Sequence, residues 1–233
     1  MNGDAGLDRV LGTLEANLRR NPRQDHRTVL AHFAVSAPDQ VARIRQLGAI
    51  VSGVPYCVSA LADQYAKVGL GPERADEMVR LGDLNRAGMR WSLHSDLPMA
   101  PADPRFLMCG AVNRVTASGR VAGPDQRVTV EEALRGVTFE AACSLKLEDE
   151  IGTISPGKRA NFTILSENPL AADPAKLRDI SVWGRVMEGR IFPASGGQKK
   201  ASLDRPMGSS GTELAFAEAA INHAFRMVAH GAE

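Results

Sequence analysis

Three short apolar segments, separated by helical patterns, constrain the fold of this chain more than any other feature. Residues 28–33, 49–54 and 89–93 are apolar without alternation, which is typical of strands buried on both faces. Helices are predicted between them, over residues 39–46 and 73–87. Buried strands that alternate with helices form parallel βαβ units, so the first part of the chain is predicted to be an α/β domain.

Composition argues against several classes of protein. The 233 residues carry a formal net charge of +1 and only 5% aromatic residues, which does not suit a nucleic-acid-binding surface. No apolar run approaches the roughly 18 residues of a membrane span, and no basic-then-apolar leader is visible. Three widely spaced cysteines form neither a disulfide framework nor a C-x-x-C site. We therefore expect a cytoplasmic protein with neither a nucleic-acid nor a membrane partner.

The pattern of the sequence changes in its last third. A single strand and then a hairpin around the Glu188-Gly189 turn predict a small β-sandwich portion over residues 151–193. Residues 194–212 are rich in Gly, Ser and Lys, which is typical of a flexible linker. Residues 213–233 are predicted to form a C-terminal amphipathic helix.

Two of the predicted strands end in side chains that can do chemistry. His32 lies at the end of the first strand, and Asp96 follows the third. Ligands gather at the carboxyl ends of parallel strands, and an imidazole with a carboxylate there can bind zinc or accept a proton from water. His94 lies two residues before Asp96, so both face the same side of an extended strand. The structural alternatives are core or loop histidines and an aspartate that forms an Asx turn.

The Gly3-Asp4 pair, which precedes the first predicted helix, has two interpretations. In the first, Asp4 is an ordinary helix cap for a helix that runs to about Arg20. In the second, the pair holds a loop at the end of a strand. The local pattern favours the cap and leaves the second interpretation open.

Several motifs, taken in order and spacing, resemble the amidohydrolase superfamily, in particular amidohydrolase family 3, which includes N-substituted formamide deformylase-like enzymes. RTVLAH at 27–32 resembles a strand that ends in a metal-binding histidine. SDLP at 95–98 resembles the end of the last barrel strand, with its catalytic aspartate. GTISPGKRANF at 152–162 resembles the return of such chains to their β-sandwich domain. The resemblance covers residues 1–193.

The resemblance implies a fold and an activity. Residues 1–150 would be the C-terminal half of a metal-dependent (β/α)8 barrel, from about strand 5 or 6 to strand 8, and residues 151–193 part of a small β-sandwich domain. The activity would be hydrolysis of non-peptide C–N bonds in a small amide-type substrate. A divalent metal, usually zinc in the family, would activate water, with Asp96 as proton shuttle and with His32 and Asp96 as metal ligands.

The chain departs from the family pattern in its metal shell. The family's His-x-His and its bridging Lys or Glu are absent, and the histidine of its His-x-x-Gly-Asp motif would fall one residue before Met1. Beside that motif, Gly3, Asp4 and His94 become candidates for outer-shell or substrate contacts. Catalytic zinc normally has three protein ligands. We therefore expect a truncated chain that holds zinc weakly or not at all and is weakly active or inactive alone.

Two other interpretations stay open. The chain can be a non-catalytic, dimerising or interaction fragment derived from an amidohydrolase. Alternatively, two copies can build one shared site from His32, Asp96 and His94. In every case the exposed edges of a partial parallel sheet favour homo-oligomers or self-association.

Overall fold

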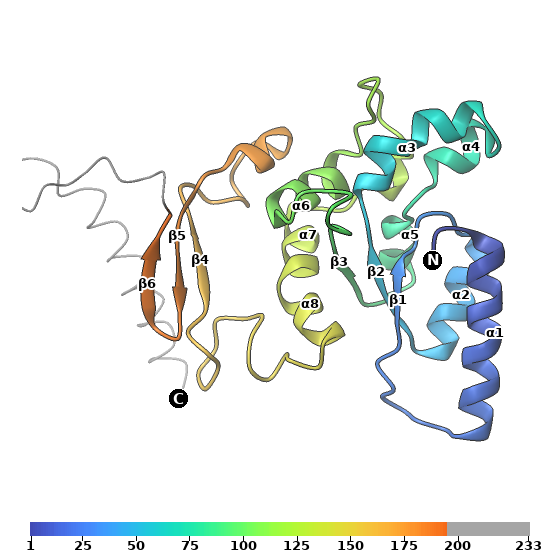
Figure 1. Cartoon of the computed structure of the whole chain (residues 1–233), viewed down its shortest axis with the longest axis horizontal. Helices are drawn as coiled ribbons and strands as arrows, with labels where there is room; N and C mark the ends of the chain where they lie inside the picture. The colour runs from blue at the N-terminus through green and yellow to red at the C-terminus, as the bar shows by residue number, and fades with distance from the viewer. Residues whose placement is uncertain (195–233) are drawn as a thin grey trace, which may run out of the picture. The chain divides into compact units, whose positions relative to one another are not determined.

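The computed structural model describes residues 1–194, which form two compact units (Figure 1). The first unit contains residues 1–148 and 167–180. The described part of the second contains residues 149–166 and 181–194. The predicted C-terminal helix and all but the first residue of the predicted linker lie outside the described residues.

The first unit is built on a parallel three-stranded sheet in the order β1-β2-β3. Its strands are β1 (Val29–His32), β2 (Ile50–Gly53) and β3 (Trp91–Leu93). They coincide with the three predicted apolar segments, and the predicted α/β class is confirmed. Because the strands are parallel, all three carboxyl ends lie at one edge of the sheet.

Eight α-helices and two short 3-10 helices accompany the three strands in the first unit. In Figure 1, α1 and α2 lie side by side. The helices are α1 (Asp4–Arg20), α2 (Pro38–Leu47), α3 (Tyr56–Lys67), α4 (Gly71–Asp76), α5 (Leu81–Arg86), α6 (Pro104–Asn113), η1 (Pro124–Gln126), α7 (Val130–Val137), α8 (Phe139–Ser144) and η2 (Pro174–Asp179).

Local signals explain where several of these helices begin and end. Leu7 and Leu11 form the fully buried stripe of α1. Helix α2 ends at Gly48, whose φ of +68° is in the left-handed region that glycine adopts readily. Helix α7 begins with a capping box, in which the Thr129 hydroxyl accepts from the Glu132 N–H and the Glu132 carboxylate accepts from the Thr129 N–H.

The prediction of a single helix over residues 73–87 is wrong, because the chain forms two helices, α4 and α5, separated by four residues. Val79 lies in the break with φ of +50°, a value that is rare for a β-branched residue. Its N–H donates to the Ala34 carbonyl at 3.0 Å, and its carbonyl accepts from the Arg114 guanidinium at 3.1 Å. Tertiary hydrogen bonds thus replace the helical ones at this point.

The second unit is an antiparallel sheet in the order β4-β5-β6. Its strands are β4 (Phe162–Leu165), β5 (Val182–Met187) and β6 (Arg190–Pro193). The hairpin predicted at Glu188-Gly189 is confirmed, and both turn residues have the positive φ that a tight hairpin turn requires. Between β4 and β5 the chain passes into the first unit over residues 167–180.

The cysteines and the helices of the described residues bear on what composition predicts. Cys57, Cys109 and Cys143 are all free thiols, and Cys57 and Cys143 are buried. Within residues 1–194, no helix is long and apolar enough to cross a membrane.

Candidate functional site

The carboxyl ends of β1 and β3 bring two histidines and an aspartate together. His32 is the last residue of β1, and His94 and Asp96 follow β3. His94 Nε2 lies 3.2 Å from His32 Nδ1, and His32 Nδ1 lies 3.8 Å from the Asp96 carboxylate. The sheet hydrogen bonds continue past the strands here, since the His94 N–H donates to the Gly53 carbonyl at 3.0 Å. Parallel pairing therefore places together side chains that are 62 residues apart in the sequence.

Ser52, on the middle strand, extends this group into a row. Its hydroxyl lies 2.9 Å from His94 Nδ1, so His94 has a polar partner on each ring nitrogen. We refer to His32, Ser52, His94 and Asp96 as the strand-end cluster. The row from Ser52 through His94 to His32 can fix the orientation of the His94 ring, because both of its nitrogens have a neighbour, and it holds the His32 ring at Nδ1.

The backbone of the strand-end cluster is strained. His32 and Phe33 have φ values of +71° and +54°, and Asp96 has +54°. The left-handed region is sparsely populated by residues other than glycine, with Asn and Asp the most tolerant. Such strain persists where surrounding structure holds it, and it concentrates at functional sites. Sequence reasoning placed His32 and Asp96 at strand ends but gave no sign of this conformation.

Burial shifts the pKa of His94 in the cluster and of Cys57 beside it, whereas Asp96 remains partly exposed. Burial, and then the neighbouring His32 ring, lower the pKa of His94, which favours a neutral imidazole in the row. Burial, and then the Asp96 carboxylate, raise the pKa of the Cys57 thiol to about 11, so this buried cysteine is no nucleophile near neutral pH. The Asp96 side chain is 44% exposed, which leaves its carboxylate accessible from solvent.

Gly3 and Asp4 have structural partners outside the strand-end cluster. Gly3 is the N-cap of α1, and Asp4 is the first residue of the helix rather than its cap. The Asp4 carboxylate accepts from Arg74 at 2.6 Å, and its carbonyl accepts from Gln40 Nε2 at 2.9 Å. These contacts tie the start of α1 to α2 and α4.

Sequence reasoning missed Ser52. The available signal was a lone hydroxyl within the otherwise apolar segment 49–54. Its significance depends on register, because Ser52 pairs with Ser92 and so lies one strand away from both histidine-bearing strands. That relation is not visible in the local sequence.

The donors of the strand-end cluster are of the right kind for a metal but few in number. Imidazole and carboxylate are ordinary zinc ligands. Across residues 1–194, no three His, Cys, Asp or Glu side chains are arranged to hold a metal ion. The strand-end cluster therefore has fewer donors than the three protein ligands that a catalytic zinc normally has.

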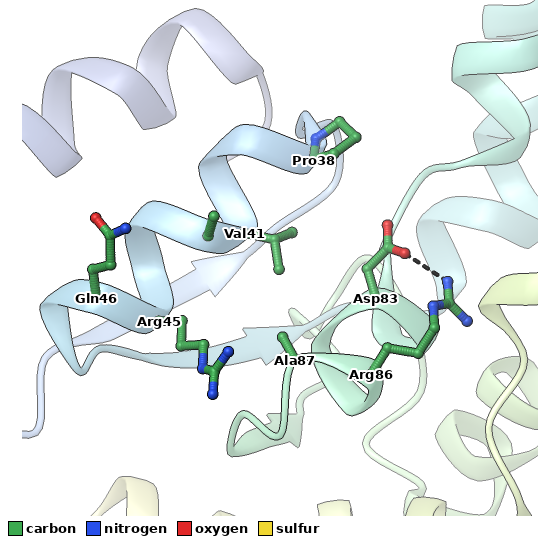
Figure 2. A pocket seen from close by; sticks show the side chains of 8 residues that line it. Pro38, Val41, Arg45, Gln46, Asp83, Arg86 and Ala87 are labelled. Carbon is green, nitrogen blue, oxygen red and sulfur yellow. Dashed lines mark hydrogen bonds and ion pairs between the residues drawn. The ribbon is translucent and has the colours of Figure 1, made fainter.

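A groove of about 580 Å³ lies elsewhere, between α2 and α5 (Figure 2). Val41 and Arg45 line one side of it, and Asp83, paired with Arg86 at 2.5 Å, lines the other. None of the residues that line it belongs to the strand-end cluster. Size alone does not make it the functional site, and the chemistry is concentrated at the strand ends.

Comparison with known proteins gives one family and several relatives. The profile of the amidohydrolase family matches residues 1–193. N-substituted formamide deformylase of Arthrobacter pascens is 29% identical over 187 residues, which is 80% of this chain and 34% of that protein. Putative amidohydrolase YtcJ of Bacillus subtilis is 27% identical over 196 residues, or 81% of this chain and 36% of that protein. The chain thus spans about a third of the length of these relatives.

Solved structures agree with the sequence relatives. An uncharacterised metal-dependent hydrolase from Pyrococcus horikoshii aligns with a TM-score of 0.62 at 27% identity, covering 74% of this chain and 34% of that one. An adenosine deaminase from Xanthomonas campestris with bound zinc aligns with a TM-score of 0.54 at 17% identity, covering 91% and 44%. The second likeness concerns the fold alone. The described α/β architecture is part of the fold of these hydrolases, as predicted.

Proposed function

Because this chain belongs to the amidohydrolase family, we propose that its strand-end cluster is part of the site of a metal-dependent hydrolase that cleaves non-peptide C–N bonds. The observation that carries the proposal is the meeting of His32 and Asp96 at the carboxyl ends of β1 and β3, both in left-handed backbone. This edge of a parallel sheet is where catalysis gathers in barrels of this architecture.

The donor chemistry supports a zinc-type ion held by His32 and Asp96. When bound, such an ion supplies a water nucleophile near neutral pH by lowering the pKa of that water. With two donors where catalytic zinc normally has three, we propose that this chain alone holds the ion weakly. The hydrolase relatives, one of them with bound zinc, support the choice of a divalent metal.

Asp96 is suited to the proton transfer. Its carboxylate is accessible and lies beside His32, so it can accept a proton from the attacking water and donate it to the leaving nitrogen. His94 is hydrogen-bonded to Ser52 through one ring nitrogen and to His32 through the other, and so keeps the His32 ring in place. We assign His94 this orienting role rather than a direct one.

The open sheet supports a proposal about assembly. Among the described residues, β1 and β3 are the outer strands of a three-stranded parallel sheet and pair with no further strand. Unpaired edges favour association. We propose that the chain self-associates, and light scattering on the purified chain, over a range of concentrations, is the direct measurement. A monomer at every concentration would contradict this part of the proposal.

The central experiment measures zinc and turnover on the same preparations. The substrate is an N-substituted formamide, because a relative is named for that activity. We expect less than one zinc per chain after dialysis, with slow hydrolysis that disappears in Asp96→Asn and zinc content that falls in His32→Ala. The matched control is Asp39→Asn, because the Asp39 carboxylate is exposed on α2. Its zinc content and turnover should equal those of the unaltered chain.

The outcomes separate the interpretations. Zinc content and turnover that are unchanged in both His32→Ala and Asp96→Asn would exclude the proposed site. One tightly held zinc per chain would show that the shell is complete without further ligands. A chain that binds no zinc, shows no turnover and still self-associates would favour a non-catalytic interaction role.

A further inference from the structure

The loop that leaves β1 needs a constraint from outside itself. It begins with the two left-handed residues His32 and Phe33, a conformation that persists only when neighbouring structure holds it. Two carbonyls of this loop accept hydrogen bonds from consecutive residues of the break between α4 and α5. The Ala34 carbonyl accepts from the Val79 N–H at 3.0 Å, and the Ser36 carbonyl accepts from Arg80 Nε at 3.0 Å. The loop is thus held at two points by one segment.

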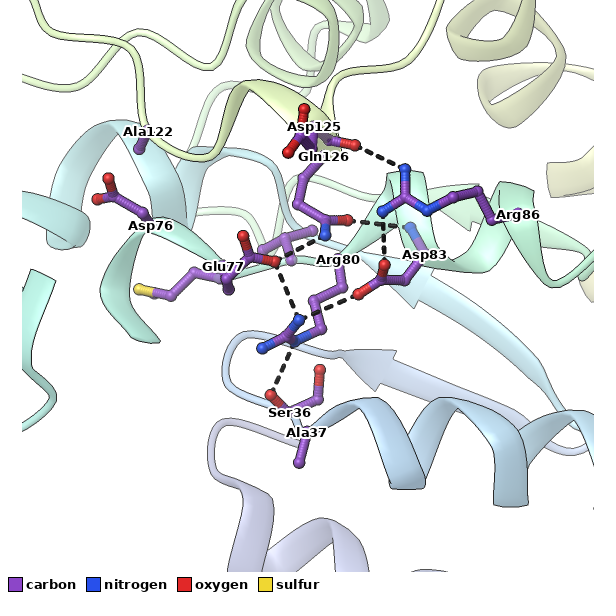
Figure 3. A network of polar contacts seen from close by, with 12 residues as sticks. Ser36, Ala37, Asp76, Glu77, Arg80, Asp83, Arg86, Ala122, Asp125 and Gln126 are labelled. Carbon is purple, nitrogen blue, oxygen red and sulfur yellow. Dashed lines mark hydrogen bonds and ion pairs between the residues drawn. The ribbon is translucent and has the colours of Figure 1, made fainter. Parts of the chain in front are cut away.

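Arg80 is itself fixed on both sides (Figure 3). Its guanidinium donates to the Glu77 carboxylate at 2.9 Å and to the Asp83 carboxylate at 3.0 Å. Its side chain is 12% exposed, so these bonds are largely shielded from water. The Ser36 carbonyl is the third acceptor. The planar guanidinium is therefore held by three acceptors in fixed directions.

Gln126 aligns the two carboxylate-bearing residues. Its amide nitrogen donates to Glu77 at 2.7 Å, and its amide oxygen accepts from the Asp83 N–H at 3.0 Å. Gln126 is 2% exposed and comes from η1, a separate part of the chain. The Gln126 amide therefore sets the distance between Glu77 and Asp83, the two residues whose carboxylates hold Arg80.

Arg114 supports the same segment from behind. It is 1% exposed, and it donates only to carbonyls, at distances between 2.7 and 3.1 Å. Three of those carbonyls belong to the end of α4 and the break after it. The four acceptors are the carbonyls of Asp76, Met78 and Val79, which are these three, and of Ala122. We refer to Asp76, Glu77, Arg80, Asp83, Arg114 and Gln126 as the arginine network.

We propose that Arg80 is a positioning residue for His32. It transmits the rigidity of the arginine network to the loop after β1, and so keeps His32 in its left-handed conformation against His94. Within residues 1–194, the Arg80 side chain bonds to Ser36, Glu77 and Asp83 and to no member of the strand-end cluster. Its effect therefore passes through the Ser36 carbonyl and the intervening backbone. The proposal rests on the proposed function only where zinc is used as a probe.

The test uses Arg80→Lys in the complete chain. A lysine keeps the positive charge between Glu77 and Asp83, but a single ammonium lacks the fork that also reaches the Ser36 carbonyl. The first readout is the set of imidazole nitrogen resonances of His32 and His94 in the metal-free chain, which report the hydrogen bond between the rings. The second is zinc affinity by titration calorimetry. Arg43→Lys is the matched control, since Arg43 pairs with Asp8 at 2.9 Å between α2 and α1.

We expect Arg80→Lys to move the imidazole resonances and to lower zinc affinity about tenfold, the lower end of the range for outer-shell changes. Arg43→Lys should leave both unchanged. A lower unfolding midpoint in Arg80→Lys with unmoved imidazole resonances would overturn the proposal, because Arg80 would then act on stability alone. If the unaltered chain binds no zinc, the proposed function fails, and positioning is judged from the imidazole resonances.

A second variant guards against loss of folding. Gln126→Met has a similar volume and removes the amide that aligns Glu77 and Asp83 while it leaves Arg80 in place. We expect smaller shifts of the same imidazole resonances. Unmoved resonances in a folded Gln126→Met chain, together with an unfolded Arg80→Lys chain, would also count against positioning.

Discussion

The strand-end cluster and the arginine network are both polar, yet they differ in how completely their groups are buried and bonded. Arg114 is 1% exposed, and its donors meet four carbonyls. Asp96 is 44% exposed, and its ion-pair neighbour is His32 at 3.8 Å. A saturated buried network contributes to stability, whereas accessible groups on strained backbone are available for chemistry. Saturation of the hydrogen bonds, more than the polarity of the groups, therefore separates the two roles.

The largest expected effect is on the arginine network. Arg114→Met keeps much of the side-chain volume and removes every donor, which leaves buried carbonyls unpaired. Burial lowers the pKa of Arg114 to about 10, so the residue remains charged near neutral pH and its bonds to carbonyls are charge-assisted. We expect the free energy of unfolding to fall by about 3 kcal/mol, measured by urea denaturation.

The control for this change is an exposed arginine. Arg19, whose side chain is 73% exposed, pairs with Glu15 on the surface of α1. Arg19→Met should change the free energy of unfolding by less than about 0.5 kcal/mol. Equal losses in the two variants would break the distinction between saturated and accessible polar groups.

A smaller effect is expected where η1 approaches α5. A Cβ at Gly82 would lie 2.3 Å from the Asp125 carbonyl oxygen and 2.8 Å from Gln126 Cα. Gly82→Ala must therefore displace the backbone that carries Gln126, at a cost of about 1–3 kcal/mol in the free energy of unfolding. Gly12, in the middle of α1, has no atom within 4 Å of such a Cβ.

The matched substitution Gly12→Ala should stabilise the protein by about 0.5–1 kcal/mol, because alanine loses less backbone entropy in a helix. Thermal and urea unfolding of the two variants, side by side, measure the difference. A neutral Gly82→Ala would show that η1 is free to shift and that the arginine network is less tightly packed than its distances indicate.

The parts of the fold that sequence could predict are those with local causes. Strands β1, β2 and β3 lie in continuous apolar runs, α2 ends at Gly48, and α7 begins at the Thr129 capping box. The break between α4 and α5 has no such local cause. It exists because Val79 bonds to Ala34 and Arg114, which are 45 and 35 residues away in the sequence. A pattern confined to one window carries no information about those partners.

The same division holds for the candidate site. His32 and Asp96 could be placed together because parallel strands end at one edge, and that rule needs only the strand assignments. The contact of Ser52 with His94 could not be predicted in this way, because it depends on strand register. The contact of Arg80 with Ser36 could not be predicted either, because it joins loops that are far apart in the sequence. His94 could be predicted in part. Its spacing from Asp96 was visible, but its partners on both ring nitrogens were not.

The smallest expected effect on stability belongs to the strand-end cluster itself. Asp96→Asn removes an accessible charge, and asparagine tolerates the left-handed backbone at this position about as well as aspartate. We expect the free energy of unfolding to stay within about 0.5 kcal/mol of the original, measured by urea denaturation. Because the variant folds as before, any loss of turnover or zinc in it can be assigned to chemistry rather than to unfolding. A loss of more than about 1 kcal/mol would instead place Asp96 with Arg114, as a group whose bonds hold the fold together.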